Sequence, residues 1–257
     1  ERLAASRFLA VVGPSGSGKS SVVRAGLMPQ LRDDDTYVVQ IVPGQHPMHE
    51  VETALLRIAS EPIPTLLEQL TADELGLKRA VERCLPTESG QLVLLIDQFE
   101  ELFTLTSPED RDSFLAALAA AVQDPRSRLK VITTVRADFY DRPLGHPAVS
   151  DLVRANTVAV TPLNAEELER AITGPAARVG VGVEPALVAE LVAQATASPG
   201  MLPLLQFALT ETFERRSGGQ LTLAAYEELG GVGGAVAQRA DDVFASLTAA
   251  GSQTVRR

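Results

Sequence analysis

The chain has 257 residues, of which 45% are apolar and 4% aromatic, so we expect one large domain or two small ones with an aliphatic core. Its 33 acidic and 23 basic residues give a net charge of −10, which disfavours direct binding of nucleic acid by this segment. The single cysteine excludes an internal disulfide, and no apolar run is long enough to span a membrane, so we expect a cytoplasmic protein without a membrane partner.

The first part of the chain alternates short apolar runs with segments of helical spacing. Strands are expected at 7–12, 37–42, 92–96, 129–135 and 157–160, and helices at 19–31, 51–59, 80–85 and 110–122. Such alternation is typical of βαβ units with a parallel sheet. The sequence therefore predicts an α/β domain over residues 1–162, with a parallel sheet flanked by helices.

The pattern changes after Pro162. Asn164 is a candidate N-cap, and two glutamates follow it in the first helical turn. Apolar residues then recur at helical spacing over 165–179, 185–196 and 202–216, without a convincing strand. We expect a small all-helical lid domain over residues 163–222. A last helix is expected from the glycine cluster at 230–234 to about residue 247, within a connecting segment over 223–257. The chain begins with Glu and ends with Arg-Arg, and we expect it to be a segment of a longer protein.

A phosphate-binding loop is predicted between the first strand and the first helix. The residues Gly13, Pro14, Ser15, Gly16, Ser17, Gly18, Lys19 and Ser20 fit the pattern GxxxxGK[ST] at every fixed position. The glycines allow successive backbone N–H groups to face a phosphate, and the following helix adds its positive N-terminal dipole. Lys19 is expected to reach the β- and γ-phosphates and Ser20 to bind Mg²⁺, with Ser21 as a further nucleotide-binding residue. A flexible Gly/Ser loop is the alternative, but the flanking strand and helix disfavour it.

The apolar run at 92–96 ends in Asp97, which places a carboxylate at the edge of the sheet beside the loop. We expect Asp97 to hold Mg²⁺ through water. Hydrolysis also needs a group that orients the attacking water. Either Glu100 or Glu101 could do this, and Gln98 could position the water without taking a proton. The alternative is a charged helix start, and spacing alone does not choose between the two glutamates.

Two further residues are candidates for the same site. Arg136 follows the strand at 129–135, where a cation could sense the γ-phosphate or simply form a surface salt bridge. Arg142 is a weaker candidate for that role. Pro203 either starts a helix or belongs to a loop that packs against the adenine base.

Six segments together resemble the STAND NTPases, and within them the bacterial "novel STAND" subgroup, whose members often carry WD40-type repeats. They are FLAVVGPSGSGKSSVVRAGLMPQL (8–31), VPGQHP (42–47), LLIDQFEELFT (94–104), TTVRADFYDR (133–142), LPLLQFALTE (202–211) and YEELGGVGGAVAQRAD (226–241). The resemblance runs over nearly the whole chain. The DQFEELFT and GGVGGA segments point to the subgroup rather than to P-loop proteins in general.

The resemblance implies a signalling switch similar to NLR immune receptors, which act in immune defence. In such proteins a sensor region keeps the ATPase closed around ADP. Sensing permits exchange for ATP and self-association, which activates an effector domain in the same longer chain. By position, Asp97 matches the Walker B residue, Arg136 the sensor-1 arginine and Pro203 the adenine-side proline. The resemblance also implies that residues 223–257 begin a link to a winged-helix domain.

One departure from related enzymes affects the expected activity. Gln98 follows Asp97 where classical AAA+ enzymes have a glutamate, which favours slow hydrolysis of ATP as a timer. A constitutive AAA+-type ATPase remains an alternative, although it would usually carry that glutamate and an arginine finger. The long helical segment after Pro162 disfavours a small-molecule kinase. A nucleotide-gated module of a transcriptional regulator is compatible with the switch interpretation.

Overall fold

The computed structural model describes residues 3, 6–198, 200–216, 218–234, 237 and 244. It divides the chain into two compact units, Glu1–Thr161 and Pro162–Arg257. Each unit contains its own cluster of buried apolar side chains. None of the described helices has the length and apolar character that a membrane span requires.

The first unit is built on a five-stranded sheet with the order β2-β3-β4-β1-β5, and all of its strand pairs are parallel. The strands are β1 (Phe8–Gly13), β2 (Thr36–Ile41), β3 (Gln91–Ile96), β4 (Leu129–Arg136) and β5 (Thr157–Ala159). Every residue of β1 is buried because the strand has a neighbour on each side and helices above and below it. The predicted fold class, a parallel sheet flanked by helices, is confirmed.

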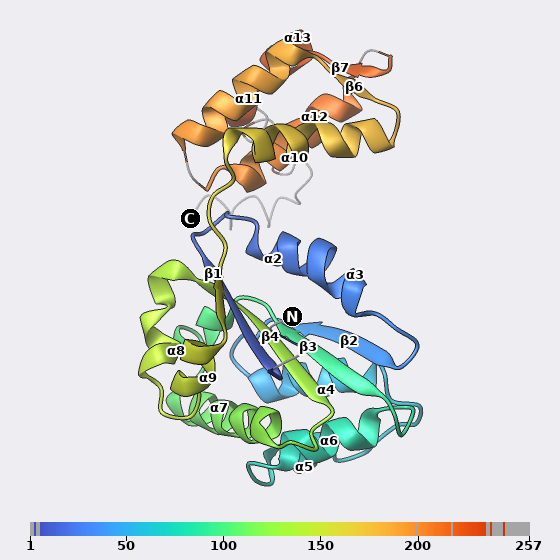
Figure 1. Ribbon diagram of the computed structural model, residues 1–257, viewed down its shortest axis with the longest axis vertical. Helices are drawn as coiled ribbons and strands as arrows, with labels where there is room; N and C mark the ends of the chain where they lie inside the picture. The colour runs from blue at the N-terminus through green and yellow to red at the C-terminus, as the bar shows by residue number, and fades with distance from the viewer. Residues whose placement is uncertain are drawn as a thin grey trace. The chain divides into compact units, whose positions relative to one another are not determined.

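Helices cover both faces of this sheet (Figure 1). One face packs against α4 (Pro47–Leu56), α5 (Leu66–Thr71), α6 (Gly76–Cys84), α7 (Pro108–Gln123) and α9 (Ser150–Ala155). The opposite face packs against the segment made of α2 (Lys19–Ser21), η1 (Val22–Leu27) and α3 (Met28–Leu31). The short η3 (Ala137–Phe139) and α8 (Asp141–Gly145) connect β4 to α9.

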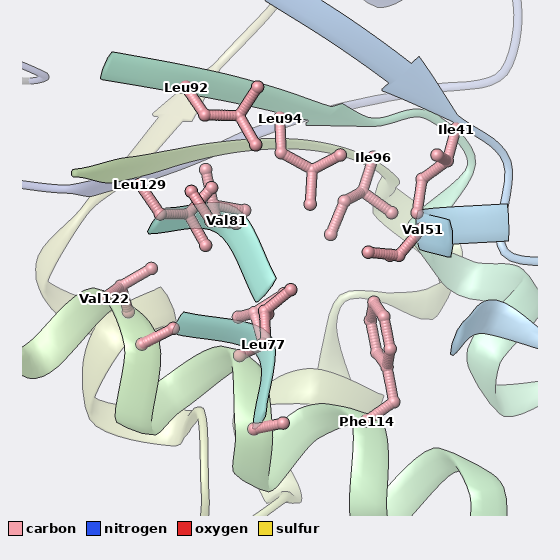
Figure 2. Packing of buried hydrophobic residues seen from close by; sticks show 14 of the residues in the cluster. Ile41, Val51, Leu77, Val81, Leu92, Leu94, Ile96, Phe114, Val122 and Leu129 are labelled. Atoms are coloured by element: carbon pink, nitrogen blue, oxygen red, sulfur yellow. The ribbon is translucent and has the colours of Figure 1, made fainter. Parts of the chain in front are cut away.

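Alternate side chains of β3 pack on opposite faces of the sheet. Leu92, Leu94 and Ile96 point toward the helices α4 to α7, as Figure 2 shows. Val93 and Leu95 belong to the cluster on the opposite face. The strand is therefore apolar throughout, as expected for a central parallel strand, and Asp97 follows at the point where the buried run ends.

The helix after the phosphate loop differs from the continuous α-helix expected over 19–31. Val22–Leu27 forms a π-helical turn, in which the N–H of Met28 donates to the carbonyl of Val23. Pro29 has no N–H for the carbonyl four residues earlier, and its ring crowds that carbonyl. The wider turn accommodates the proline. The short helix α5 was also not expected.

The second unit contains α10 (Ala165–Arg178), α11 (Pro185–Ala197), α12 (Leu202–Glu214) and α13 (Leu223–Glu228). Asn164 caps α10 with a capping box: its side chain accepts from the N–H of Glu167, whose carboxylate accepts from the N–H of Asn164, both at 2.9 Å. Two short strands, β6 (Gly182–Val183) and β7 (Gln220–Leu221), add a parallel ladder that the all-helical expectation did not include. Beyond residue 234, the expected last helix and connecting segment lie outside the described residues, apart from 237 and 244.

Candidate functional site

The loop over residues 13–20 turns the chain from the end of β1 into α2. Gly16 and Gly18 have φ angles of 71° and 84°, a left-handed conformation that disfavours any residue with a side chain. A Cβ atom on Gly13 would lie 2.5 Å from the carbonyl oxygen of Val160, too close for any other residue. At Gly18, in contrast, a Cβ would meet no atom within 4 Å. The glycines therefore shape a backbone that stays open on its outer side.

Lys19 lies at the start of α2 and is only 9% exposed. Its Nζ donates to the carbonyl oxygens of Gly13 at 2.9 Å and Pro14 at 2.8 Å, so the loop wraps around the ammonium group. Burial lowers the pKa of Lys19, and the negative charge of Glu100 opposes this effect. A phosphate oxygen is a stronger, charged acceptor than these neutral carbonyls. The loop and its lysine thus have the chemistry that a phosphate group requires.

Asp97 directly follows β3, and it is only 3% exposed. Its Oδ1 accepts hydrogen bonds from the hydroxyls of Ser20 at 2.7 Å and Thr134 at 2.5 Å, and its Oδ2 accepts from the guanidinium of Arg24 at 2.5 Å. The Ser20 hydroxyl and the Asp97 carboxylate are hard oxygen ligands of the kind that Mg²⁺ takes. The described residues contain no group of three or more His, Cys, Asp or Glu that could hold a metal alone. A metal here would therefore need phosphate and water ligands as well, which is typical of Mg²⁺.

Gln98 has a left-handed backbone, with a φ angle of 56°, which is unfavourable for a residue other than glycine. Its N–H donates to the Thr134 hydroxyl at 3.0 Å, while its side chain is exposed. The 3₁₀ helix η2 (Phe99–Phe103) follows, anchored by the buried side chains of Phe99 and Leu102. This sharp turn places both glutamates of η2 at the same edge of the sheet.

The two glutamates have different partners. Glu100 is 7% exposed, and its Oε2 accepts from the backbone N–H of Arg136 at 3.2 Å. Glu101 accepts from the N–H of Gly44 at 3.1 Å, and Thr106 donates to the carbonyl of the same glycine at 2.7 Å. Glu101 thus holds the loop after β2, whereas Glu100 is joined to the end of β4.

The guanidinium of Arg136 is 2.6 Å from the carboxylate of Asp138 and 5.4 Å from the ring centre of Phe139. The hydrogen bond between Arg136 and Asp138 raises the pKa of Arg136 and lowers the pKa of Asp138. Arg142 is exposed, lies 3.8 Å from Asp141 and does not line the pocket described next. In this structure both arginines form ion pairs with nearby aspartates.

A pocket of about 360 Å³ brings these segments together. It is lined by Ser15, Gly16, Lys19, Ser20, Gln98, Glu100, Glu101, Thr104, Leu105, Thr134, Arg136 and Phe139. Half of the residues that the sequence predicts for the site line this pocket, including both glutamates and Arg136. Asp97 is not among the lining residues, but it accepts hydrogen bonds from Ser20 and Thr134, which are. Pro203 belongs to the second unit, where it is exposed in the first turn of α12.

Another pocket, of about 220 Å³, lies away from these residues and is lined by Arg7, Arg128 and Lys130 among others. Arg7 and Arg128 both donate to backbone carbonyls nearby, so their role is structural. None of the predicted site residues lines it. The chemistry of the site is therefore concentrated in the pocket around Lys19.

The sequence interpretation missed two residues of the site, Arg24 and Thr134. Arg24 lies four residues after Ser20, so helical spacing could have placed it on the same face of the helix. Thr134 reaches Asp97 only because β4 lies beside β3 in the sheet. That strand order is not encoded in the local pattern of either strand.

A family model described as novel STAND NTPase 1 matches residues 1–257. No curated protein matches the chain.

Among solved structures, a Walker-type ATPase of Pyrococcus abyssi has a TM-score of 0.58 and 18% identity, and the match covers 100% of this chain and 73% of that one. The Aeropyrum pernix ORC1 protein in complex with DNA has a TM-score of 0.60 and 18% identity, covering 94% and 63%. The ADP form of the Aeropyrum pernix ORC2 protein has a TM-score of 0.58 and 15% identity, covering 92% and 64%. The chain thus spans less than two thirds of the two Aeropyrum proteins, and similarity at these identities shows the fold alone.

Proposed function

This chain belongs to the novel STAND NTPase 1 family, and on that premise we propose that it is the ATP/ADP-binding switch domain of a longer signalling protein. The observation that carries the proposal is the pocket in which a glycine-shaped loop, the buried Lys19 and Ser20 meet, with Asp97 hydrogen-bonded to Ser20 behind it. A phosphate chain with a bound cation matches this combination of a cationic amine, backbone donors and hard oxygen ligands.

ATP and ADP with Mg²⁺ are the proposed ligands. Lys19 would exchange its carbonyl partners, Gly13 and Pro14, for phosphate oxygens. Ser20 and Asp97 would hold Mg²⁺, which when bound neutralises the charge that develops on the phosphates. At Gly18 a Cβ atom would meet no atom within 4 Å, so the loop has free space beside it for a bound ligand.

Glu100 is our candidate for the residue that orients the attacking water. It lines the pocket, it is buried, and its negative charge opposes the lowering of the Lys19 pKa by burial. Both carboxylates accept from a backbone N–H. Glu101 is the weaker candidate because its partner is Gly44 in the loop after β2, whereas Glu100 is bonded to Arg136, which we propose reads the γ-phosphate. Gln98 cannot take a proton, so the residue directly after Asp97 contributes no general base. This arrangement supports slow, regulatory hydrolysis and disfavours a constitutive motor of the AAA+ type.

A switch requires that its two states bind ATP and ADP with different affinities. Only the γ-phosphate differs between the two nucleotides, and Arg136 is the proposed reader because it lines the pocket. Typical couplings of this kind are about 1–3 kcal/mol. We further propose that the second unit responds to the bound nucleotide and that Pro203 of α12 belongs to the adenine side of the site. We also propose that the protein self-associates on activation and that the longer chain carries sensor repeats and an effector domain. The proposed location is the cytoplasm.

The proposal is tested by calorimetry of ADP and ATP with wild type and Lys19→Ala. Removal of the buried ammonium is expected to cost about 2–5 kcal/mol, or roughly 30-fold or more in affinity. Lys130→Ala is the control, because it removes the same charge from a residue outside the pocket. Equal affinities of Lys19→Ala and wild type would sink the assignment of the loop.

A further inference from the structure

The carboxylate of Asp97 is almost fully buried, and in this structure its charge is offset by an arginine. The Asp97 side chain is 4% exposed, whereas that of its partner Arg24 is 49% exposed. Ser20 and Thr134 donate hydrogen bonds to Oδ1 but bring no positive charge. Arg24 alone among these partners supplies the cation that a buried carboxylate requires.

The local fold places Arg24 in this position. It lies one turn after Ser20 and within the π-helical turn η1, so its side chain reaches the same carboxylate as the Ser20 hydroxyl. π-Helical turns inside α-helices often occur at functional sites. The side chain of Arg24 is half-exposed and the Asp97 carboxylate that it contacts is buried. The arginine side chain can therefore move into solvent without disturbing the core.

We propose that Arg24 is a built-in countercation for Asp97, which holds the metal site in the nucleotide-free state and must move away from Oδ2 before Mg²⁺, held directly or through water, can neutralise this carboxylate. The inference rests on the proposed function, because it takes Ser20 and Asp97 as the metal-binding pair. A guanidinium and a divalent cation at the same carboxylate repel each other, so the binding of one weakens the binding of the other. Arg24 therefore competes with Mg²⁺ and lowers the apparent affinity for the metal.

The test compares wild type with Arg24→Gln, Arg24→Lys and the control Arg32→Gln. Arg32 is exposed and lies beyond α3, so its substitution removes the same charge without touching Asp97. Calorimetry measures ADP affinity in millimolar Mg²⁺ and in EDTA, and the ratio of the two affinities reports the coupling to the metal.

Arg24→Gln is expected to increase this ratio about fivefold to tenfold, the range for a charged hydrogen bond discounted for its exposed partner. The metal-free complex weakens because Asp97 then repels the phosphates, while the Mg²⁺ complex gains a free ligand. Arg24→Lys should fall between this variant and wild type, and Arg32→Gln should match wild type. A ratio that stays within about twofold of wild type, or falls, overturns the role of Arg24.

A second measurement does not depend on nucleotide binding. In EDTA and without nucleotide, Arg24→Gln should melt at a lower temperature than Arg32→Gln, because it leaves a buried carboxylate unpaired. Millimolar Mg²⁺ should raise the melting temperature of Arg24→Gln and leave that of wild type nearly unchanged. Equal shifts in both proteins would overturn the inference. If wild type fails to bind ADP, the proposed function fails, and this comparison still decides the role of Arg24.

Discussion

Two adjacent threonines of β4 allow a matched test of the hydrogen-bond network around Asp97. Thr134 is 2% exposed, and its hydroxyl donates to Asp97 at 2.5 Å and accepts from the N–H of Gln98 at 3.0 Å. Thr133 is 0% exposed, and within the described part of the chain its hydroxyl has no hydrogen-bond partner. Substitution by valine keeps the shape of either side chain and replaces the hydroxyl with a methyl group.

Thr134→Val is expected to lower the free energy of unfolding of the first unit by about 2–4 kcal/mol. A hydrogen bond to a charged group contributes about 1.5–3 kcal/mol and one to a neutral group about 0.5–1.5 kcal/mol, and the Gln98 N–H would lose its acceptor. Thr133→Val should instead be neutral or stabilising by up to about 2 kcal/mol, because a buried hydroxyl without a partner is itself unfavourable. The same chemical change is therefore expected to have opposite signs at neighbouring positions.

Hydrogen exchange of the buried amides of β1 is the assay, because it gives a free energy of unfolding for the first unit. Global denaturation of a chain with two separate cores shows shifts between variants but yields no single free energy that belongs to one unit. These amides report the unfolding of the first unit alone. A Thr134→Val variant as stable as wild type would show that these hydrogen bonds do not stabilise the first unit. An equal loss of stability in Thr133→Val and Thr134→Val would show that the loss comes from packing rather than from the hydrogen bonds.

Glu100→Gln is expected to slow ATP hydrolysis by about 10²–10⁴-fold, the range for a group that acts on the attacking water. Glu101→Gln should slow hydrolysis much less. The assay is phosphate release under saturating ATP, and an equal loss of turnover in the two variants would contradict the assignment of Glu100. Hydrogen exchange over residues 202–212 should differ between the nucleotide-free protein, its ADP complex and its complex with a non-hydrolysable ATP analogue. Identical protection in all three states would remove the second unit from the proposed switch.

The features that the sequence predicted best are those encoded in short contiguous segments. The central strands were recognisable because parallel strands buried on both faces are apolar throughout, and each buried run has a clear end. The loop at residues 13–20 was recognisable because its backbone conformation requires glycine at fixed positions. The position of Asp97 follows directly from the end of β3.

The features that were missed depend on contacts between distant segments or on elements too short to show a period. Thr134 is unremarkable in its own strand and gains its partner only through the pairing of β3 with β4. The ladder of β6 and β7 has two residues in each strand, too few for an alternating pattern. The spacing between Ser20 and Arg24 is visible in the sequence, but the buried acceptor that the arginine pairs with is not.

The fold also decides which hydrogen-bond partner each of the two glutamates, Glu100 and Glu101, has. Asp97 joins the end of β3 to Thr134 of β4, and Glu100 joins η2 to the backbone of Arg136 at the end of the same strand. Glu101 joins η2 to Gly44, which follows β2. The segment from 97 to 101 therefore ties together the ends of three adjacent strands as well as carrying charge into the pocket. A substitution at Glu101 acts first on the loop after β2, whereas one at Glu100 acts beside Lys19. Turnover measured for any variant of this segment consequently reports catalysis only when the stability of the first unit has been measured for the same variant.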